Sequence, residues 1–282
     1  MLQPKLKEIM KSVKLSIVVL LLLGAVSCKK STNAVPALTP NVSNSEAADI
    51  VASSISLNTN GVTTVSDDAT NVANSQSLNL GGSYAEFPKN AAEKNRSVRV
   101  FVPKNLSCGD TKKDSITRQS ISGAAIGYSY SSIYSFTLNC KNNVPDSLNA
   151  SSAFSGTYSG PIITSVYTGS ANMTVSGLQP AATNFTINGN YQRTGNFKSK
   201  KDTTNSGTHT VNIVVTNLSV VKAGRTIAGG SATITVTGNV VKKGNWTYTG
   251  TIVFNNDGTA TLTLNNVVYT ITLNSGLFVL KA

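Results

Sequence analysis

The sequence predicts a mainly β protein, an antiparallel meander that forms a sandwich or a curled half-barrel, preceded by a short helical segment. Three observations support this. Apolar and polar residues alternate over most of the chain after about residue 95, which is the period of a strand with one buried face. Asn and Gly recur between these stretches and favour tight turns. One earlier stretch, from Ser45, has helical spacing of its apolar residues instead.

The N-terminus has the features of an export signal. Four lysines precede an apolar run, Leu15–Leu23, which is shorter than the roughly 20 residues of a membrane-spanning helix. Small residues then lead to Cys28. We therefore expect a signal peptide over residues 1–27. Two types of signal peptide are possible: a lipoprotein signal, after which Cys28 is lipid-modified, and a plain secretory signal, which leaves Cys28 as a free thiol.

Ala25-Val26-Ser27-Cys28 resembles the lipobox of bacterial lipoproteins. Lys29-Lys30 and a Ser/Asn/Thr-rich stretch follow it. Together these features make the chain similar to Bacteroidetes-type outer-membrane lipoproteins with a type II signal peptide. The resemblance implies acylation of Cys28 and a membrane partner reached through the lipid anchor. Surface-exposed members commonly carry acids after the cysteine. None follows Cys28 here, which favours the periplasmic face of the outer membrane. The resemblance brings no catalytic residue.

Removal of residues 1–27 leaves 20 basic and 11 acidic side chains, a net charge of +9 (24 − 4 and 12 − 1). These charges are scattered along the chain. The densest cluster, Lys198–Lys201, is followed by Asp202 and is typical of a loop tip. Nucleic-acid binding would need clustered basic side chains with stacking aromatics, so we expect no nucleic-acid partner.

The polar, Pro-punctuated residues 28–44 predict a flexible tether. A partly helical segment follows over residues 45–94, with Ser45 as N-cap of a first helix. A weaker helix is predicted from Val62 to Ser75, beyond the break at Asn60-Gly61.

The antiparallel β domain is predicted over residues 95–282, from the alternation at Val98–Val102 onward. A loop at Gly258 would pair Phe254 with Ala260, and a turn at Asn265-Asn266 would pair Leu264 with Val267. This register keeps apolar residues on one face through three strands. The sequence leaves open whether the sheet is a sandwich, a barrel or an open half-barrel.

A weak internal match lies within about residues 186–246. Thr186–Phe197 and Thr235–Trp246 share the form T-[IV]-x-G-N-x-x-[RK]-x-G-N-[FW]. The match predicts either a duplicated unit of about 50 residues or convergence of similar Thr/Gly/Asn-rich hairpins.

Cys108 and Cys140 remain once Cys28 is assigned to the anchor. In an oxidising compartment such a pair is most simply a disulfide. Metal ligation and redox catalysis are the alternatives, but no histidine lies nearby and no C-x-x-C motif is present.

No catalytic constellation is visible in the sequence. Its one histidine, His209, lies on the same strand face as the apolar residues Val211 and Ile213. Beyond residue 150 the only acidic residues are Asp202 and Asp257, and both are in predicted turns. A serine triad or a glycosidase pair needs more than this. Metal-binding and cofactor motifs are absent too, so we expect no enzyme, no metal and no cofactor.

The tyrosines on one predicted strand face, Tyr128, Tyr130 and Tyr134, fit either the core or a ligand-facing surface. The sequence thus predicts a non-enzymatic envelope lipoprotein with a binding or structural role. One alternative is a periplasmic carrier of lipid or another apolar ligand in a curled sheet. The other is a carbohydrate-binding or adhesive surface module.

Overall fold

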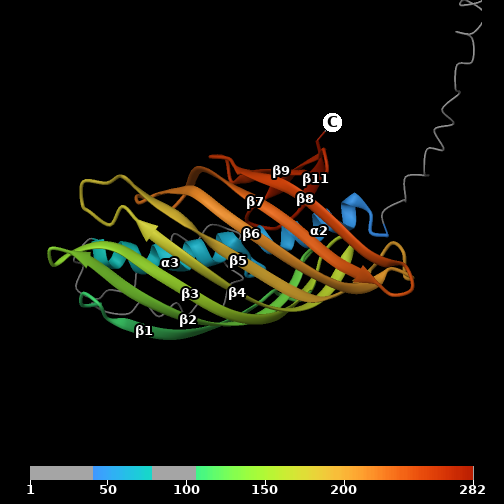
Figure 1. Cartoon of the computed structure of the whole chain (residues 1–282), viewed down its shortest axis with the longest axis horizontal. Coiled ribbons are helices and arrows are strands. Elements are labelled where there is room, and N and C mark those ends of the chain that lie inside the picture. Colours follow the sequence, from blue (N-terminus) through green and yellow to red (C-terminus); the bar gives the residue numbers. More distant parts are fainter. Residues whose placement is uncertain (1–40, 78–105, 282) are drawn as a thin grey trace, which may run out of the picture. The chain divides into compact units, whose positions relative to one another are not determined.

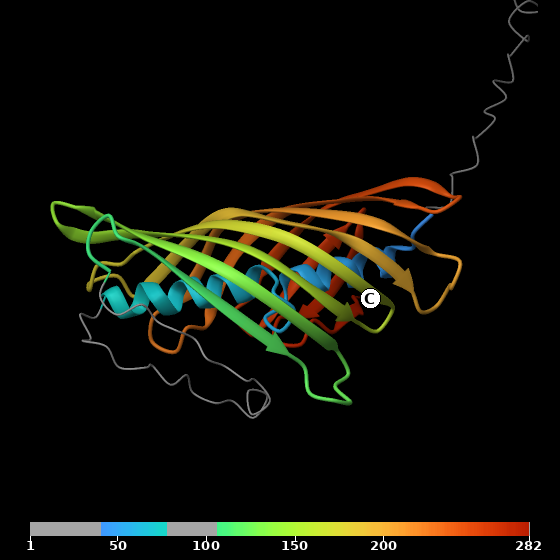
Figure 2. The same ribbon diagram turned by 90° about the horizontal axis from the view of Figure 1, so that it is seen from below.

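In the computed structural model, which describes residues 41–77 and 106–281, one curved antiparallel sheet curls around two helices (Figures 1 and 2). The helices are α2 (Asn44–Ile55) and α3 (Val62–Ser77). The strands follow in chain order: β1 (Thr111–Gln119), β2 (Gly127–Lys141), β3 (Val144–Ser159), β4 (Ile163–Ser176), β5 (Asn184–Ser199), β6 (Ser206–Val221), β7 (Ile227–Val240), β8 (Gly244–Phe254), β9 (Thr259–Leu264), β10 (Val267–Thr272) and β11 (Phe278–Leu280).

Each strand pairs with its neighbours in the sequence, and the sheet is not closed into a barrel. The predicted antiparallel meander is therefore confirmed in its open, curled form. A sandwich is excluded because the described strands form a single sheet. The strand predicted at Val98–Val102, the signal peptide and Cys28 lie outside the described residues.

The predicted C-terminal register is confirmed. Phe254 pairs with Ala260 and Leu264 with Val267. Gly258 has φ 80°, and Asn265 and Asn266 have φ 45° and 67°. Gly and Asn tolerate this left-handed backbone, which a two-residue hairpin turn needs at both central positions.

The two segments of the internal match have different structures. Thr186–Phe197 lies wholly within β5, whereas Thr235–Trp246 runs from β7 through a turn into β8. A duplicated unit would place equivalent residues in equivalent elements, so the likeness at these residues is one of composition.

Helix α2 begins two residues before the predicted start, because its N-cap is Ser43 and not Ser45. With Ser43 as N-cap, Glu46 takes position N3, and its carboxylate accepts from the backbone N–H of Ser43 at 2.8 Å. This reciprocal capping box is out of reach if Ser45 is the cap. The predicted tether is also too long, since Val42 is buried and residues 41–44 belong to the folded part.

Helices α2 and α3 of the predicted N-terminal helical segment pack against the inner face of the sheet (Figure 2), and residues 78–94 of that segment lie outside the described residues. Every residue from Glu46 to Ile55 is buried, and so are Val65, Asp68 and Val72 of α3. Among the described residues, no helix is long and apolar enough to cross a membrane.

Candidate functional site

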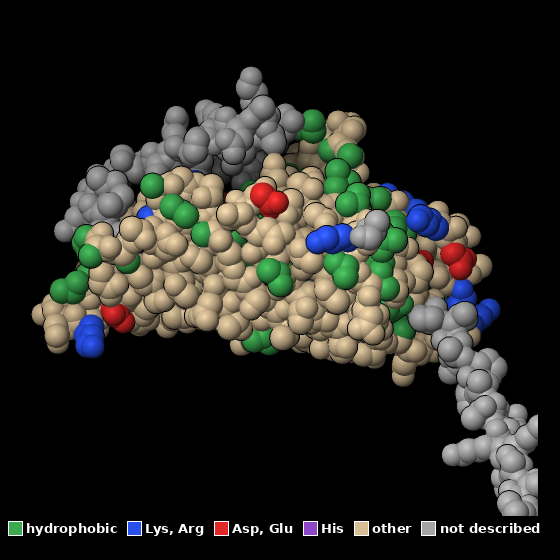
Figure 3. Space-filling view, turned by 90° about the horizontal axis from the view of Figure 1, so that it is seen from above, with side chains coloured by type: hydrophobic (Ala, Val, Ile, Leu, Met, Phe, Trp, Pro, Cys, Tyr) green, Lys and Arg blue, Asp and Glu red, His purple; other side chains and the backbone are tan. Residues whose placement is uncertain are grey.

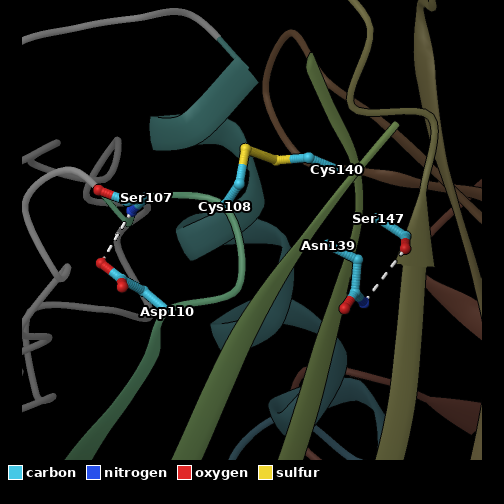
Figure 4. Close-up of a disulfide and its surroundings, with 6 residues drawn as sticks. All are labelled: Ser107, Cys108, Asp110, Asn139, Cys140 and Ser147. Atoms are coloured by element: carbon cyan, nitrogen blue, oxygen red, sulfur yellow. Dashed lines mark hydrogen bonds between the residues drawn. A yellow bond between two sulfur atoms is a disulfide. The ribbon is translucent and has the colours of Figure 1, made fainter. Parts of the chain in front are cut away.

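A disulfide ties the beginning of the described sheet together. Cys108, in the loop before β1, is bonded to Cys140 near the end of β2 (Figure 4). The same loop is held by Asp110, which accepts from the backbone N–H of Ser107 at 3.0 Å. The predicted pairing is confirmed, and Cys140 packs partly buried against the core, so the bond is structural.

Asp68 of α3 is the centre of a buried polar cluster. The Arg118 guanidinium of β1 donates to both of its carboxylate oxygens, at 2.6 and 3.2 Å. The Tyr134 hydroxyl donates to the same carboxylate at 2.9 Å, and Arg118 also donates to Tyr130 at 3.1 Å. Burial lowers the pKa of Arg118, but the adjacent Asp68 outweighs it and holds that pKa well above its usual range. The cluster therefore fixes α3 to β1 and β2.

Asp49 plays the same part on α2. Its carboxylate accepts from the Tyr158 hydroxyl at 2.6 Å and from the backbone N–H groups of Ile162 and Ile163 at 2.8 and 2.9 Å. Burial raises the pKa of Asp49 even though these hydrogen bonds oppose the shift. The contact attaches α2 to β3 and to the β3–β4 turn.

A third contact, from β5, reaches the loop between the two helices. Arg193 donates to the Ser53 hydroxyl at 2.9 Å and to the Thr59 carbonyl, and its guanidinium lies 3.8 Å from the centre of the Tyr167 ring. The Tyr191 hydroxyl donates to the Asn60 carbonyl at 3.0 Å. Long polar side chains of the inner face thus end on the helical segment.

His209 lies in the core of the described structure. It is buried beside Phe197, with ring centres 6.3 Å apart, and burial followed by the charge of Arg193 lowers its pKa to about 3. Within the described parts of the chain, its Nδ1 has no hydrogen-bond partner and no group of three His, Cys, Asp or Glu residues could hold a metal.

The three candidate tyrosines lie on the inner side of β2. Tyr130 and Tyr134 are buried in the Asp68 cluster, and Tyr128 is half-buried. Tyr130 and Tyr134 thus belong to the core. Sequence reasoning missed the partners of this face, because the residues that meet there lie 50 to 140 positions apart.

The outer side of strands β4–β8 is almost free of charge. Strands β4–β8 contain two charged residues, Arg193, which points inward, and Lys198, which points outward. Figure 3 accordingly shows few blue or red side chains. The exposed outward positions hold mainly hydroxyl and amide side chains: Thr168, Ser170, Asn172, Thr174, Asn190, Gln192, Thr194, Thr208, Asn212, Thr216, Thr233, Thr247, Thr249 and Thr251. We call this surface the outer face.

The two ends of the sheet differ in charge. The β5–β6 and β7–β8 turns and their flanks meet at the end where α2 begins, which we call the anchor end. Exposed lysines there outnumber acids: Lys198, Lys200, Lys201, Lys242 and Lys243 against Asp202. At the opposite, far end the charges balance: Lys112, Lys113, Lys141, Lys222 and Arg225 against Asp67, Asp110, Asp114, Asp146 and Asp257.

Comparison with protein family models, curated proteins and solved structures gives no match for this chain.

Proposed function

We propose that this chain is a non-enzymatic envelope lipoprotein, anchored through acylated Cys28, that binds an uncharged, hydroxyl-rich polymer such as an envelope glycan through its outer face. The observation that carries the proposal is the composition of that face, a broad array of Thr, Ser, Asn and Gln side chains with Lys198 as the one outward charge on β4–β8. Surfaces of soluble domains usually carry many charges of both signs.

The inner face is a poor candidate for ligand binding because the protein's own helices occupy it. Asp49, Asp68 and the loop at Thr59–Asn60 accept hydrogen bonds from tyrosine and arginine side chains that point inward. A carrier of apolar ligands would need α2 and α3 to move out of the curled sheet. Arg118 and Arg193 would then lose these hydrogen-bond partners. No contact in the described residues favours that alternative.

Hydroxyl and amide groups suit a neutral glycan for a physical reason. Each can exchange a hydrogen bond to water for one to a sugar hydroxyl, without the larger cost of desolvating a charge. Neighbouring strands lie about 4.8 Å apart, so the outer face repeats its donors and acceptors in two directions. Many weak contacts along one polymer add through effective concentration.

The glycan proposal can be tested by affinity electrophoresis of the mature chain, with Cys28→Ala, in gels containing neutral polysaccharides such as glucans or mannans. We expect at least one of them to slow the protein. Asn190→Lys with Thr249→Lys places two charges on the outer face and should abolish the retardation, because each ammonium group would lose its hydration when the polysaccharide covers it. The matched control, Ala181→Lys with Asn256→Lys, adds the same charge on far-end loops and should bind like the parent.

Retardation by none of the polysaccharides, or equal retardation of the outer-face variant and the parent, would refute glycan binding through this face. Anchoring is tested separately by incorporation of radiolabelled palmitate into the full chain. We expect label in the parent and none in Cys28→Ala.

A further inference from the structure

The anchor end combines two features that lie apart in the sequence. The meander brings Lys242 and Lys243 of the β7–β8 turn beside the β5–β6 turn, where Lys243 donates to Asp202 at 3.3 Å and to Thr204 at 3.1 Å. The other lysines of this end outnumber the acids, and Lys198, Lys201 and Lys242 have no acidic partner among the described residues. The blue side chains in Figure 3 accordingly lie mostly toward this end, on the right.

The first described residues also lie at this end. Asn41 donates from its side chain to the Lys243 carbonyl, and the Tyr248 hydroxyl donates to the Val42 carbonyl at 2.6 Å. Burial raises the pKa of Tyr248 to about 12, so this donor stays protonated. Asn41 and Val42 are therefore fixed beside the lysine-rich turns.

The connection to Cys28 is short. Asn41 is the thirteenth residue after Cys28, and a chain of that length spans at most about 45 Å when fully extended and roughly 20 Å when flexible. Strands of 16 residues such as β5 and β6 extend about 50 Å. At its flexible span of roughly 20 Å, a connection to Cys28 keeps the anchor end closer to the bilayer than the far end.

We propose that the anchor end binds the anionic headgroups of the membrane that holds Cys28. This rests on the lipidation in the proposed function. Lysine side chains are long and flexible, so their ammonium groups reach phosphates while the turns stay outside the acyl region. Two exposed aliphatic side chains lie in turns at the same end, Val241 (57% exposed) beside Lys242 and Ile121 (48%) in the β1–β2 turn, and can enter the interface between headgroups.

With this contact, the strands would extend from the bilayer surface outward, with the anchor end nearest the headgroups. The outer face would then be open to the space beyond the headgroups, and the charge-balanced far end would point away from the membrane. Two attachments, the acyl chains and the lysines, would together set one orientation.

The contact can be tested without the lipid anchor, by co-sedimentation of the mature Cys28→Ala chain with vesicles. One set contains phosphatidylcholine alone and the other the same lipid mixed with phosphatidylglycerol. We expect binding to the anionic vesicles only, and loss of binding at high salt. Lys201→Gln with Lys242→Gln should weaken it about 30-fold, the factor for two lysines near an anionic surface.

The matched control is Lys112→Gln with Lys113→Gln, which removes the same charge from exposed positions of β1 and should bind like the parent. Lys29 and Lys30 of the tether are present in every variant. Absence of binding by the parent, or an equal loss in both variants, would overturn the proposal. Because Cys28 is replaced throughout, these results are independent of whether the native chain is acylated and of glycan binding.

Discussion

The inner and outer faces of this sheet are built from alternate residues of the same strands, yet their polar groups differ in kind. Inward arginine and tyrosine side chains are long and bond to the helices, as Arg118 bonds to Asp68 and Tyr158 to Asp49. The exposed outward polar groups of β4–β8 are mainly small hydroxyls and amides. The comparison indicates that inner polarity determines the fold, whereas outer polarity is available for contacts with other molecules.

The helices explain why the inner face needs polar side chains. α2 and α3 are rich in Ser, Thr, Asp and Asn, yet they are buried over most of their length. A buried polar group is stable only when it is hydrogen-bonded. The strand tyrosines and arginines supply those bonds, so helices and sheet depend on each other.

The largest expected effect comes from breaking the Asp68 cluster. Asp68→Asn should lower the free energy of unfolding by about 3–5 kcal/mol, because Arg118 would remain charged and buried without a counter-ion. The neighbouring Asp67→Asn is the control. Asp67 is partly exposed and lies 3.7 Å from Arg225, and such surface pairs contribute about 1 kcal/mol or less. Urea denaturation of both variants measures the difference.

Equal losses in the two variants would contradict the distinction between buried and exposed carboxylates on α3. A loss below about 1 kcal/mol for Asp68→Asn would mean that water replaces the carboxylate, and that the inner face is less closed than its burial indicates.

A smaller effect should appear when the pH is lowered. His209 stays neutral in the folded chain, because its pKa falls from its ordinary value of 6.5 to about 3, but it takes up a proton when unfolded. Acid therefore favours the unfolded state, and between pH 7.5 and pH 5 the free energy of unfolding should fall by about 2 kcal/mol. His209→Gln should remove this dependence. Urea midpoints at several pH values test it, and a dependence that persists in the variant would assign the effect to other groups.

Much of the fold could be predicted from local pattern. Strand alternation, the turns at Gly258 and Asn265-Asn266 and the Cys108–Cys140 pair all depend on residues close in sequence or on a count of cysteines. The predicted N-cap at Ser45 is wrong although two serines precede Glu46 and the S-x-x-E spacing of a capping box favours Ser43.

The candidate surfaces could not be predicted in the same way. The anchor end needs the β5–β6 and β7–β8 turns side by side, which depends on the meander register over some 40 residues. The burial of the helices depends on hydrogen bonds that Asp49 and Asp68 accept from side chains 109 and 50 residues away in the sequence. One period-2 pattern describes a free sheet face and a helix-covered one equally well, so Tyr130 and Tyr134 fitted both a core and a ligand platform.

The smallest expected effect is on the outer face, and it tests whether hydroxyl side chains there serve stability or contact. Thr251 of β8 is exposed between Thr233 and Thr263 on the neighbouring strands. Thr251→Lys should change the free energy of unfolding by no more than about 0.5 kcal/mol, as for most surface positions. The adjacent, inward Ile252→Ala should cost about 2–5 kcal/mol through a core cavity, and thermal or urea unfolding of the pair measures both. If Thr251→Lys instead costs well over 1 kcal/mol, cross-strand threonine contacts stabilise the sheet. The composition of the outer face would then have a structural cause and would no longer support a glycan partner.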